Sequence, residues 1–120
     1  MSDLFKLDGK TAMLMGGAGG IGRGLSLGLS QAGANVVVAD MVDMEVLNDF
    51  AGEIKSQTGN DTMAVQVDVV SEDSVSKVVK EVVEKFGTID ILINAMGLNI
   101  KNPALDYPME DWDKMFNVNV

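Results

Sequence analysis

Residues 14–23 contain five glycines in ten positions, and this stretch separates two contrasting patterns. The apolar run at 12–15 before it is typical of a strand that is buried on both faces of a sheet. After it, residues recur at helical spacing and predict one face of a helix: Ile21, Leu25, Gly28, Leu29 and Ala32. Gly33 indicates where this helix stops, so the order is strand, glycine loop, helix.

This order is the setting in which a glycine loop binds a phosphate group. Glycine allows the backbone to turn with positive φ and to approach a ligand closely. The helix directs unpaired N–H groups and a partial positive charge at the loop. The spacing Gly16-x-x-x-Gly20-x-Gly22 differs from the common G-x-G-x-x-G dinucleotide pattern. Because a tight turn explains two glycines but not five, we interpret the loop as a phosphate cradle.

The composition excludes several classes of function. With 120 residues, 47% of them apolar and 22% charged, the chain is expected to form one globular domain with its own core. The net charge of −9 argues against binding to nucleic acid or anionic membranes. The absence of cysteine and histidine excludes disulfides, thiolate nucleophiles and histidine bases, and no metal site is predicted.

The N-terminal segment and the apolar runs indicate where the protein resides. Residues 1–6 show no basic stretch followed by an apolar core, so no secretion signal is predicted. The apolar runs are too short to span a bilayer. A cytoplasmic location is the expectation.

Four apolar segments alternate with helical patterns along the chain. Strands are predicted near residues 11–15, 36–39, 63–67 and 89–94, and helices near 20–32, 43–56, 72–86 and from 109 onward. Such βαβ units form a doubly wound α/β fold, with a parallel sheet of strand order 3-2-1-4 and helices on both faces. The side chains predicted to face inward are Val46, Leu47, Phe50 and Ile54 in the second helix, and Val75, Val78, Val79, Val82, Val83 and Phe86 in the third.

The last predicted helix carries an apolar face that reaches the final residue without a capping signal: Trp112, Met115, Phe116 and Val120. The fourth strand would also remain an uncovered apolar edge. We therefore expect residues 1–120 to be the N-terminal, cofactor-binding part of a longer fold.

In an open parallel sheet, ligands bind beyond the carboxyl ends of the strands. Asp40 ends the second strand, 18 residues after Gly22, where a carboxylate accepts hydrogen bonds from an adenosine ribose. It would repel a 2′-phosphate, and no basic residue stands at Gly19 or Met41, so NAD is predicted over NADP. A turn or capping role is the alternative for Asp40, as it is for Asp68 and Asn94.

Taken together, the motifs resemble the short-chain dehydrogenase/reductase family along essentially the whole chain. They are the loop 16–22, Asp40, Asp68-Val69, Asn94-Ala95-Met96-Gly97, Trp112 and Val118-Asn119. The resemblance implies that the loop holds the pyrophosphate, Asp40 the ribose and Asp68 with Val69 the adenine. It also implies that residues 94–97 line the floor below the cofactor and that Asn119 is the active-site asparagine. The predicted cofactor-binding set is Gly16, Gly17, Gly20, Ile21, Gly22, Asp40, Asp68, Val69, Asn94, Ala95, Met96 and Gly97.

The chain departs from the family pattern at several points. Met15 stands where the family usually has threonine, and Asn94-Ala95-Met96-Gly97 replaces Asn-Asn-Ala-Gly. The family's catalytic serine and its Tyr-x-x-x-Lys pair have no counterpart. Tyr107 is followed four residues later by Asp111, and it precedes Asn119 instead of following it.

The resemblance implies an NAD-dependent oxidoreductase that interconverts a secondary alcohol and a ketone. The stretch 97–108 is most similar to gluconate 5-dehydrogenase-type enzymes, so the expected substrates are sugar acids or polyols and the expected assembly is a dimer or tetramer. Three alternatives remain open. They are a non-catalytic nucleotide-binding fragment or subunit, a reductase of 3-oxoacyl thioesters, and an S-adenosylmethionine methyltransferase.

Overall fold

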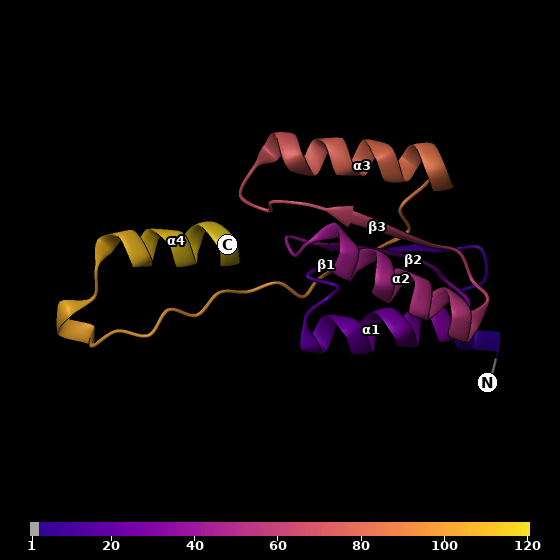
Figure 1. The fold of residues 1–120 in the computed structure, drawn as a ribbon, viewed down its shortest axis with the longest axis horizontal. Coiled ribbons are helices and arrows are strands. Elements are labelled where there is room, and N and C mark those ends of the chain that lie inside the picture. Colours follow the sequence, from indigo (N-terminus) through magenta and orange to yellow (C-terminus); the bar gives the residue numbers. More distant parts are fainter. Residues whose placement is uncertain (1–2) are drawn as a thin grey trace.

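A four-stranded parallel sheet lies at the centre of the computed structural model, which describes residues 3–120 (Figure 1). Met1 and Ser2, part of the N-terminal segment considered above, lie outside the described residues. The strands are β1 (Thr11–Met15), β2 (Asn35–Asp40), β3 (Thr62–Gln66) and β4 (Ile91–Asn94). Their order is β3-β2-β1-β4, which confirms the predicted order 3-2-1-4.

Helices cover both faces of the sheet, as predicted for a doubly wound fold. One face carries α1 (Gly20–Gln31) and α2 (Met44–Thr58), and the opposite face carries α3 (Glu72–Phe86). A fourth helix, α4 (Met109–Asn119), lies beyond the carboxyl ends of the strands (Figure 1). Short 3-10 turns occupy Asp3–Phe5 and Ala104–Asp106. Within residues 3–120, no helix has the length and apolar character needed to cross a membrane.

The helix ends follow from local sequence signals. The Ser71 side chain accepts a hydrogen bond from the backbone N–H of Ser74 at 3.2 Å, which confirms it as the N-cap of α3. Gly59 and Gly87 end α2 and α3 with φ angles of 76° and 84°. α2 extends two residues beyond the predicted Ser56, and β4 begins two residues later than predicted.

The buried face of α1 differs from the prediction. Ile21 is 76% exposed and Leu25 is 38% exposed, whereas Gly22, Ser26 and Ser30 are buried. Small residues allow this face to lie close to the glycine loop and to the end of α2, where the serine hydroxyls have partners. Ser26 Oγ donates to the carbonyl of Gly17 at 3.4 Å, and Ser30 Oγ lies 2.8 Å from the hydroxyl of Thr58.

The predicted faces of α2 and α3 are confirmed only in their central parts. Leu47, Phe50 and Ile54 of α2 are buried, while Val46 is 42% exposed. Along α3, Val78 and Val82 are buried, and Val75 and Phe86 pack against them from the margin. Val79 and Val83 remain partly exposed because the apolar stripe is wider than the contact that α3 makes with the sheet.

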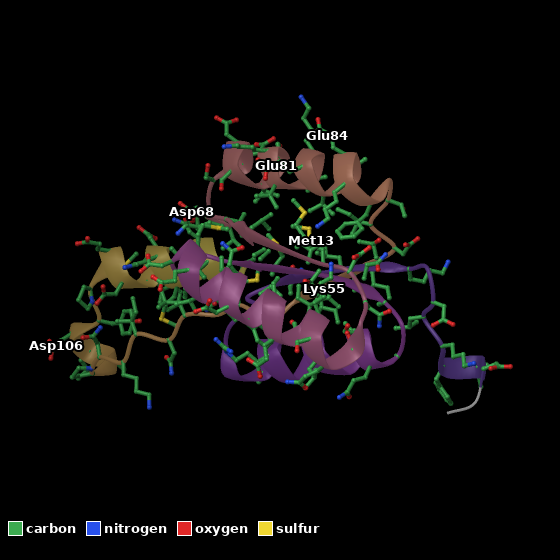
Figure 2. The ribbon with its side chains drawn as sticks, turned by 45° about the vertical axis from the view of Figure 1, so that its right-hand side comes forward. Met13, Lys55, Asp68, Glu81, Glu84 and Asp106 are labelled. Carbon is green, nitrogen blue, oxygen red and sulfur yellow. The ribbon has the colours of Figure 1, made fainter. Side chains whose placement is uncertain are left out.

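The core has two layers, because successive side chains of a strand point to opposite faces of the sheet. Ala12 and Leu14 of β1 pack with Leu47 and Phe50 under α1 and α2. Met13 and Met15 pack with valines under α3. Figure 2 shows Met13 between the sheet and α3, with Glu84 on the outer side of that helix.

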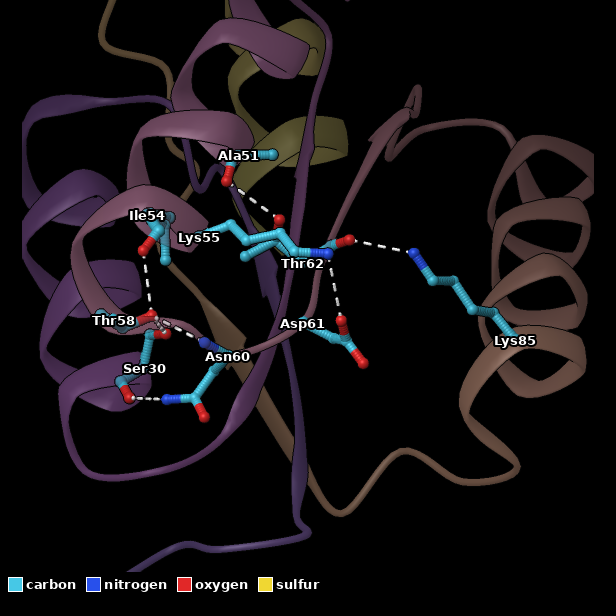
Figure 3. Close-up of polar contacts among 9 residues, drawn as sticks. All are labelled: Ser30, Ala51, Ile54, Lys55, Thr58, Asn60, Asp61, Thr62 and Lys85. Carbon is cyan, nitrogen blue, oxygen red and sulfur yellow. Dashed lines mark hydrogen bonds and ion pairs between the residues drawn. The ribbon is translucent and has the colours of Figure 1, made fainter.

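Side-chain hydrogen bonds fasten β3 to the helices on both sides (Figure 3). Thr62 Oγ1 donates to the carbonyl of Ala51 at 2.9 Å, and Lys85 Nζ donates to the carbonyl of Thr62 at 3.0 Å. Before β3, Asn60 Nδ2 donates to the carbonyl of Ser30 at 2.7 Å. These bonds fix the position at which β3, and with it Gln66, reaches the carboxyl edge of the sheet.

Candidate functional site

A groove with a volume of about 1040 Å³ lies between the carboxyl ends of the strands and α4. Its lining includes seven of the predicted cofactor residues: Gly16, Asp40, Asp68, Val69, Ala95, Met96 and Gly97. The rest of the lining lies outside the predicted cofactor-binding set: Gly19, Met41, Val67, Val70, Leu98, Glu110, Asp113, Lys114, Asn117 and Val118. Half of these additional lining residues belong to α4. The position of α4 relative to the sheet depends on the long loop that precedes it.

The other predicted site residues lie around the groove without lining it. Gly17 and Gly22 are buried beneath the glycine loop, and Gly20 and Ile21 are exposed at the start of α1. Asn94 ends β4, in register with Met15 of β1. Asn119 lies at the end of α4.

Two of the loop glycines are required for steric reasons, and a third is not. Gly16 has a φ angle of +82°, and a Cβ atom there would lie 2.6 Å from the backbone nitrogen of Met96. A Cβ on Gly22 would overlap the carbonyl oxygen of Gly16. A Cβ on Gly20 would meet no atom within 4 Å. Gly16 and Gly22 therefore serve the packing of the loop, whereas the space at Gly20 remains open.

The N-terminus of α1 fits an anionic group. Gly19 occupies the N-cap position, where it has no side chain to cap the helix. The first N–H groups of a helix have no acceptor within the helix, so those of Gly20, Ile21 and Gly22 can donate to a ligand. The partial positive charge at this helix end favours a phosphate.

The carboxylate of Asp40 connects the glycine loop to the end of β2. Its Oδ2 accepts a hydrogen bond from the backbone N–H of Ala18 at 3.1 Å, and its Oδ1 accepts one from Met41 at 2.7 Å. Each carboxylate oxygen can accept a further hydrogen bond. Asp40 therefore has a structural role in the loop and retains acceptor capacity toward the groove.

Asp68 combines a turn role with a place in the groove lining. Its Oδ1 accepts from the backbone N–H of Val70 at 3.1 Å, and its own N–H donates to Ser74 Oγ at 3.0 Å. This is the ordinary loop chemistry of an aspartate before a helix. Val69 packs against the core under α3 and also borders the groove.

Asn119 joins α4 to the loop that follows β4. Its Nδ2 donates to the carbonyl of Leu98 and its Oδ1 accepts from the N–H of Leu98, both at 2.9 Å. Because both polar atoms of the amide are engaged, the side chain holds the backbone at the groove margin.

Tyr107 lies away from this groove. Its hydroxyl is 2.6 Å from the carbonyl of Ile100 and 2.8 Å from Met115 Sδ. It lines a separate cavity of about 430 Å³, together with Trp112 and Phe116, whose rings stack with centroids 4.9 Å apart.

Arg23 is a supporting residue that the sequence interpretation missed. Its Nε donates to the carbonyl of Ala18 at 3.0 Å, and its guanidinium lies 4.4 Å from the ring centroid of Phe50. Ala18 is thus held from both sides, through its N–H by Asp40 and through its carbonyl by Arg23. The sequence offered one indication of this role, because Arg23 directly follows Gly22 and so lies next to the glycine loop.

Comparison with known proteins identifies the family. The sequence model described as short chain dehydrogenase matches residues 10–120. The chain is 36% identical over 121 residues to 2-dehydro-3-deoxy-D-gluconate 5-dehydrogenase of Pseudoalteromonas atlantica, covering 100% of this chain and 47% of the relative.

Solved structures agree with this match. A short-chain type dehydrogenase/reductase from Mycobacterium marinum superimposes with a TM-score of 0.92 at 33% identity, covering 100% of this chain and 49% of that one. An NAD+-bound xylitol dehydrogenase has a TM-score of 0.89 at 32% identity, covering 96% and 44%. The chain spans about half the length of the relatives it matches. It belongs to the short chain dehydrogenase family.

Proposed function

We propose that residues 1–120 form the NAD-binding domain of an enzyme that interconverts a secondary alcohol and a ketone. The observation that carries the proposal is the groove in which the uncapped N-terminus of α1 lies near the carboxylate of Asp40. This pairing of an anion site with a hydroxyl acceptor suits a dinucleotide. Nicotinamide binding is a property of the family, and one similar structure is described as NAD+-bound.

In this proposal, different residues of the site hold different parts of the cofactor. The amides of Gly20, Ile21 and Gly22 bind the pyrophosphate, and Asp40 accepts the ribose hydroxyls. Asp68 and Val69 flank the adenine, and residues 95–97 form the floor, directly after Asn94 at the end of β4. When bound, the nicotinamide supplies the hydride chemistry, while the protein supplies binding and orientation. Asn119 acts by holding the backbone at Leu98 in place beside this floor.

The charge of the groove supports NAD over NADP. The ionisable residues that line it are Asp40, Asp68, Glu110, Asp113 and Lys114, so carboxylates outnumber the single ammonium. An additional 2′-phosphate would enter a negative field. Arg23 is the cation of the glycine loop, and it is held against Phe50 outside the groove lining.

Sugar acids or polyols are the proposed substrate class, and a homo-oligomer is the proposed assembly of the complete protein. The similarity to a 2-dehydro-3-deoxy-D-gluconate 5-dehydrogenase supports this choice. The test is a panel of sugar acids, polyols and 3-oxoacyl thioesters, assayed with NAD(H) and the complete natural protein. Turnover of the thioester alone would favour the reductase alternative.

Replacing Asp40 with alanine is expected to weaken NAD binding about 10-fold or more, because charged hydrogen bonds to the ribose are lost. NADP binding should weaken less, since a repulsive charge is removed as well. A further substitution, Met41→Arg, should shift the preference more strongly toward NADP. Calorimetric titration of both cofactors measures the ratio, and Asp61→Ala is the control because Asp61 is paired with Lys55 away from the groove. An unchanged ratio would show that Asp40 does not face the ribose.

Replacing Gly20 with valine is expected to reduce NAD affinity at least about 10-fold while the stability changes by less than about 0.5 kcal/mol. The new side chain would enter open space at the N-terminus of α1, where the pyrophosphate is proposed to bind. Gly28→Val is the matched control, since Gly28 lies on the same helix and also borders open space. Equal NAD affinities for the two variants would contradict the phosphate site.

A further inference from the structure

The side chain of Gln66 connects the carboxyl end of the edge strand β3 to the turn that follows its neighbour β2. Gln66 is the last residue of β3 and is paired in register with Asp40 of β2. Its Nε2 donates to the carbonyl of Met41 at 3.2 Å and to the carbonyl of Val42 at 3.0 Å. An amide nitrogen carries two hydrogens, so this arrangement satisfies both of them.

The turn that Gln66 holds has few other restraints. Met41 is 64% exposed and Val42 is 40% exposed, so burial of apolar surface contributes little to the position of either residue. The backbone N–H of Met41 in turn donates to Asp40 Oδ1 at 2.7 Å. A displacement of the turn would therefore move the hydrogen-bond donor that orients the Asp40 carboxylate.

We propose that Gln66 is a positioning residue for ribose recognition, acting through the Met41–Val42 turn on Asp40. This inference rests on the proposed NAD-binding function. The Gln66 side chain does not line the groove, so its effect on a ligand passes through the turn. A hydrophobic side chain of similar length would leave both carbonyls without this donor. The hydrogen bond from Met41 to Asp40 Oδ1 would lose its fixed geometry, and only the bond from Ala18 to Oδ2 would still orient the carboxylate.

The test is a double-mutant cycle with NAD as the probe, measured by calorimetry on the complete natural protein. Gln66→Met is expected to weaken NAD binding roughly 3- to 10-fold, the effect of losing one or two hydrogen bonds. In the Asp40→Ala background the same substitution should change the affinity less than about twofold, because the group that it positions is gone. Gln57→Met is the control, since Gln57 Nε2 donates to Glu53 on the outer side of α2.

A second measurement separates this inference from the proposed function. In the ligand-free protein, hydrogen exchange of the Met41 amide should be faster in Gln66→Met than in Gln57→Met. Normal NAD binding with unchanged Met41 exchange would overturn the positioning role alone, as would an equal loss of affinity in both backgrounds. No NAD binding by the unsubstituted protein would overturn the proposed function and this inference with it.

Discussion

Replacing Gly22 with valine is expected to lower the free energy of unfolding by about 3 kcal/mol or more, a large share of the stability of an ordinary domain. A Cβ atom at this position would overlap the carbonyl oxygen of Gly16 and lie 2.8 Å from the Cα atom of Gly17. Both are backbone atoms, so no side-chain rotation relieves the overlap. Urea denaturation followed by circular dichroism measures the loss.

The control for this prediction lies two residues further along the same helix. A Cβ added to Gly24 meets no atom within 4 Å, and alanine is favoured over glycine inside a helix by up to about 1 kcal/mol. Gly24→Ala should therefore raise the stability while Gly22→Val lowers it. A stable Gly22→Val protein with an unchanged denaturation midpoint would contradict the described packing of the loop.

A polypeptide of residues 1–120 is expected to show no measurable hydride transfer, even if it binds NAD. The reaction needs a proton donor or acceptor at the substrate oxygen, and such assistance contributes about 10²- to 10⁴-fold. The sequence contains no histidine or cysteine. The Tyr107 hydroxyl is bonded to Ile100 and faces a different cavity, and Asn119 is engaged on both sides by Leu98.

The measurement is NADH formation from a polyol panel by a polypeptide whose mass is verified. NAD binding by the same preparation serves as the control, because it separates a missing catalytic group from a missing cofactor. Robust NAD-dependent oxidation by this polypeptide would show that Asp106, Asp111 or another carboxylate acts as the acid–base group.

The sheet could be predicted because its determinants are local in the sequence. Apolar runs of three or four residues define the strands, and Gly59, Ser71 and Gly87 mark helix ends by their own local requirements. The buried face of α1 could not be predicted in this way. Leu25 is more hydrophobic than Gly22 or Ser26, yet it is the more exposed residue. Gly22 and Ser26 are buried because only small side chains fit where the helix packs against residues 16 and 17.

The same distinction separates the predicted part of the groove from the part that was missed. Asp40, Asp68 and Met96 were predictable because strand ends of a parallel sheet meet at one edge. Glu110 and Lys114 reach the groove through the path of residues 95–108, which no periodic pattern describes. The contribution of Gln66 depends on a side-chain geometry that sequence spacing does not contain.

The serine-lined face of α1 also determines which sequence changes the protein can accumulate. Ser26 and Ser30 are fully buried and are not part of the groove lining, yet they contact Gly17 of the glycine loop and Thr58 of α2. A larger residue at either position would be expected to displace the helix from these neighbours, and with it the amides proposed to bind the pyrophosphate. Exposed positions on the same helix, such as Leu25, are expected to tolerate more substitutions. Evolutionary constraint on this domain should therefore be strong at small buried residues behind the groove, which do not line it.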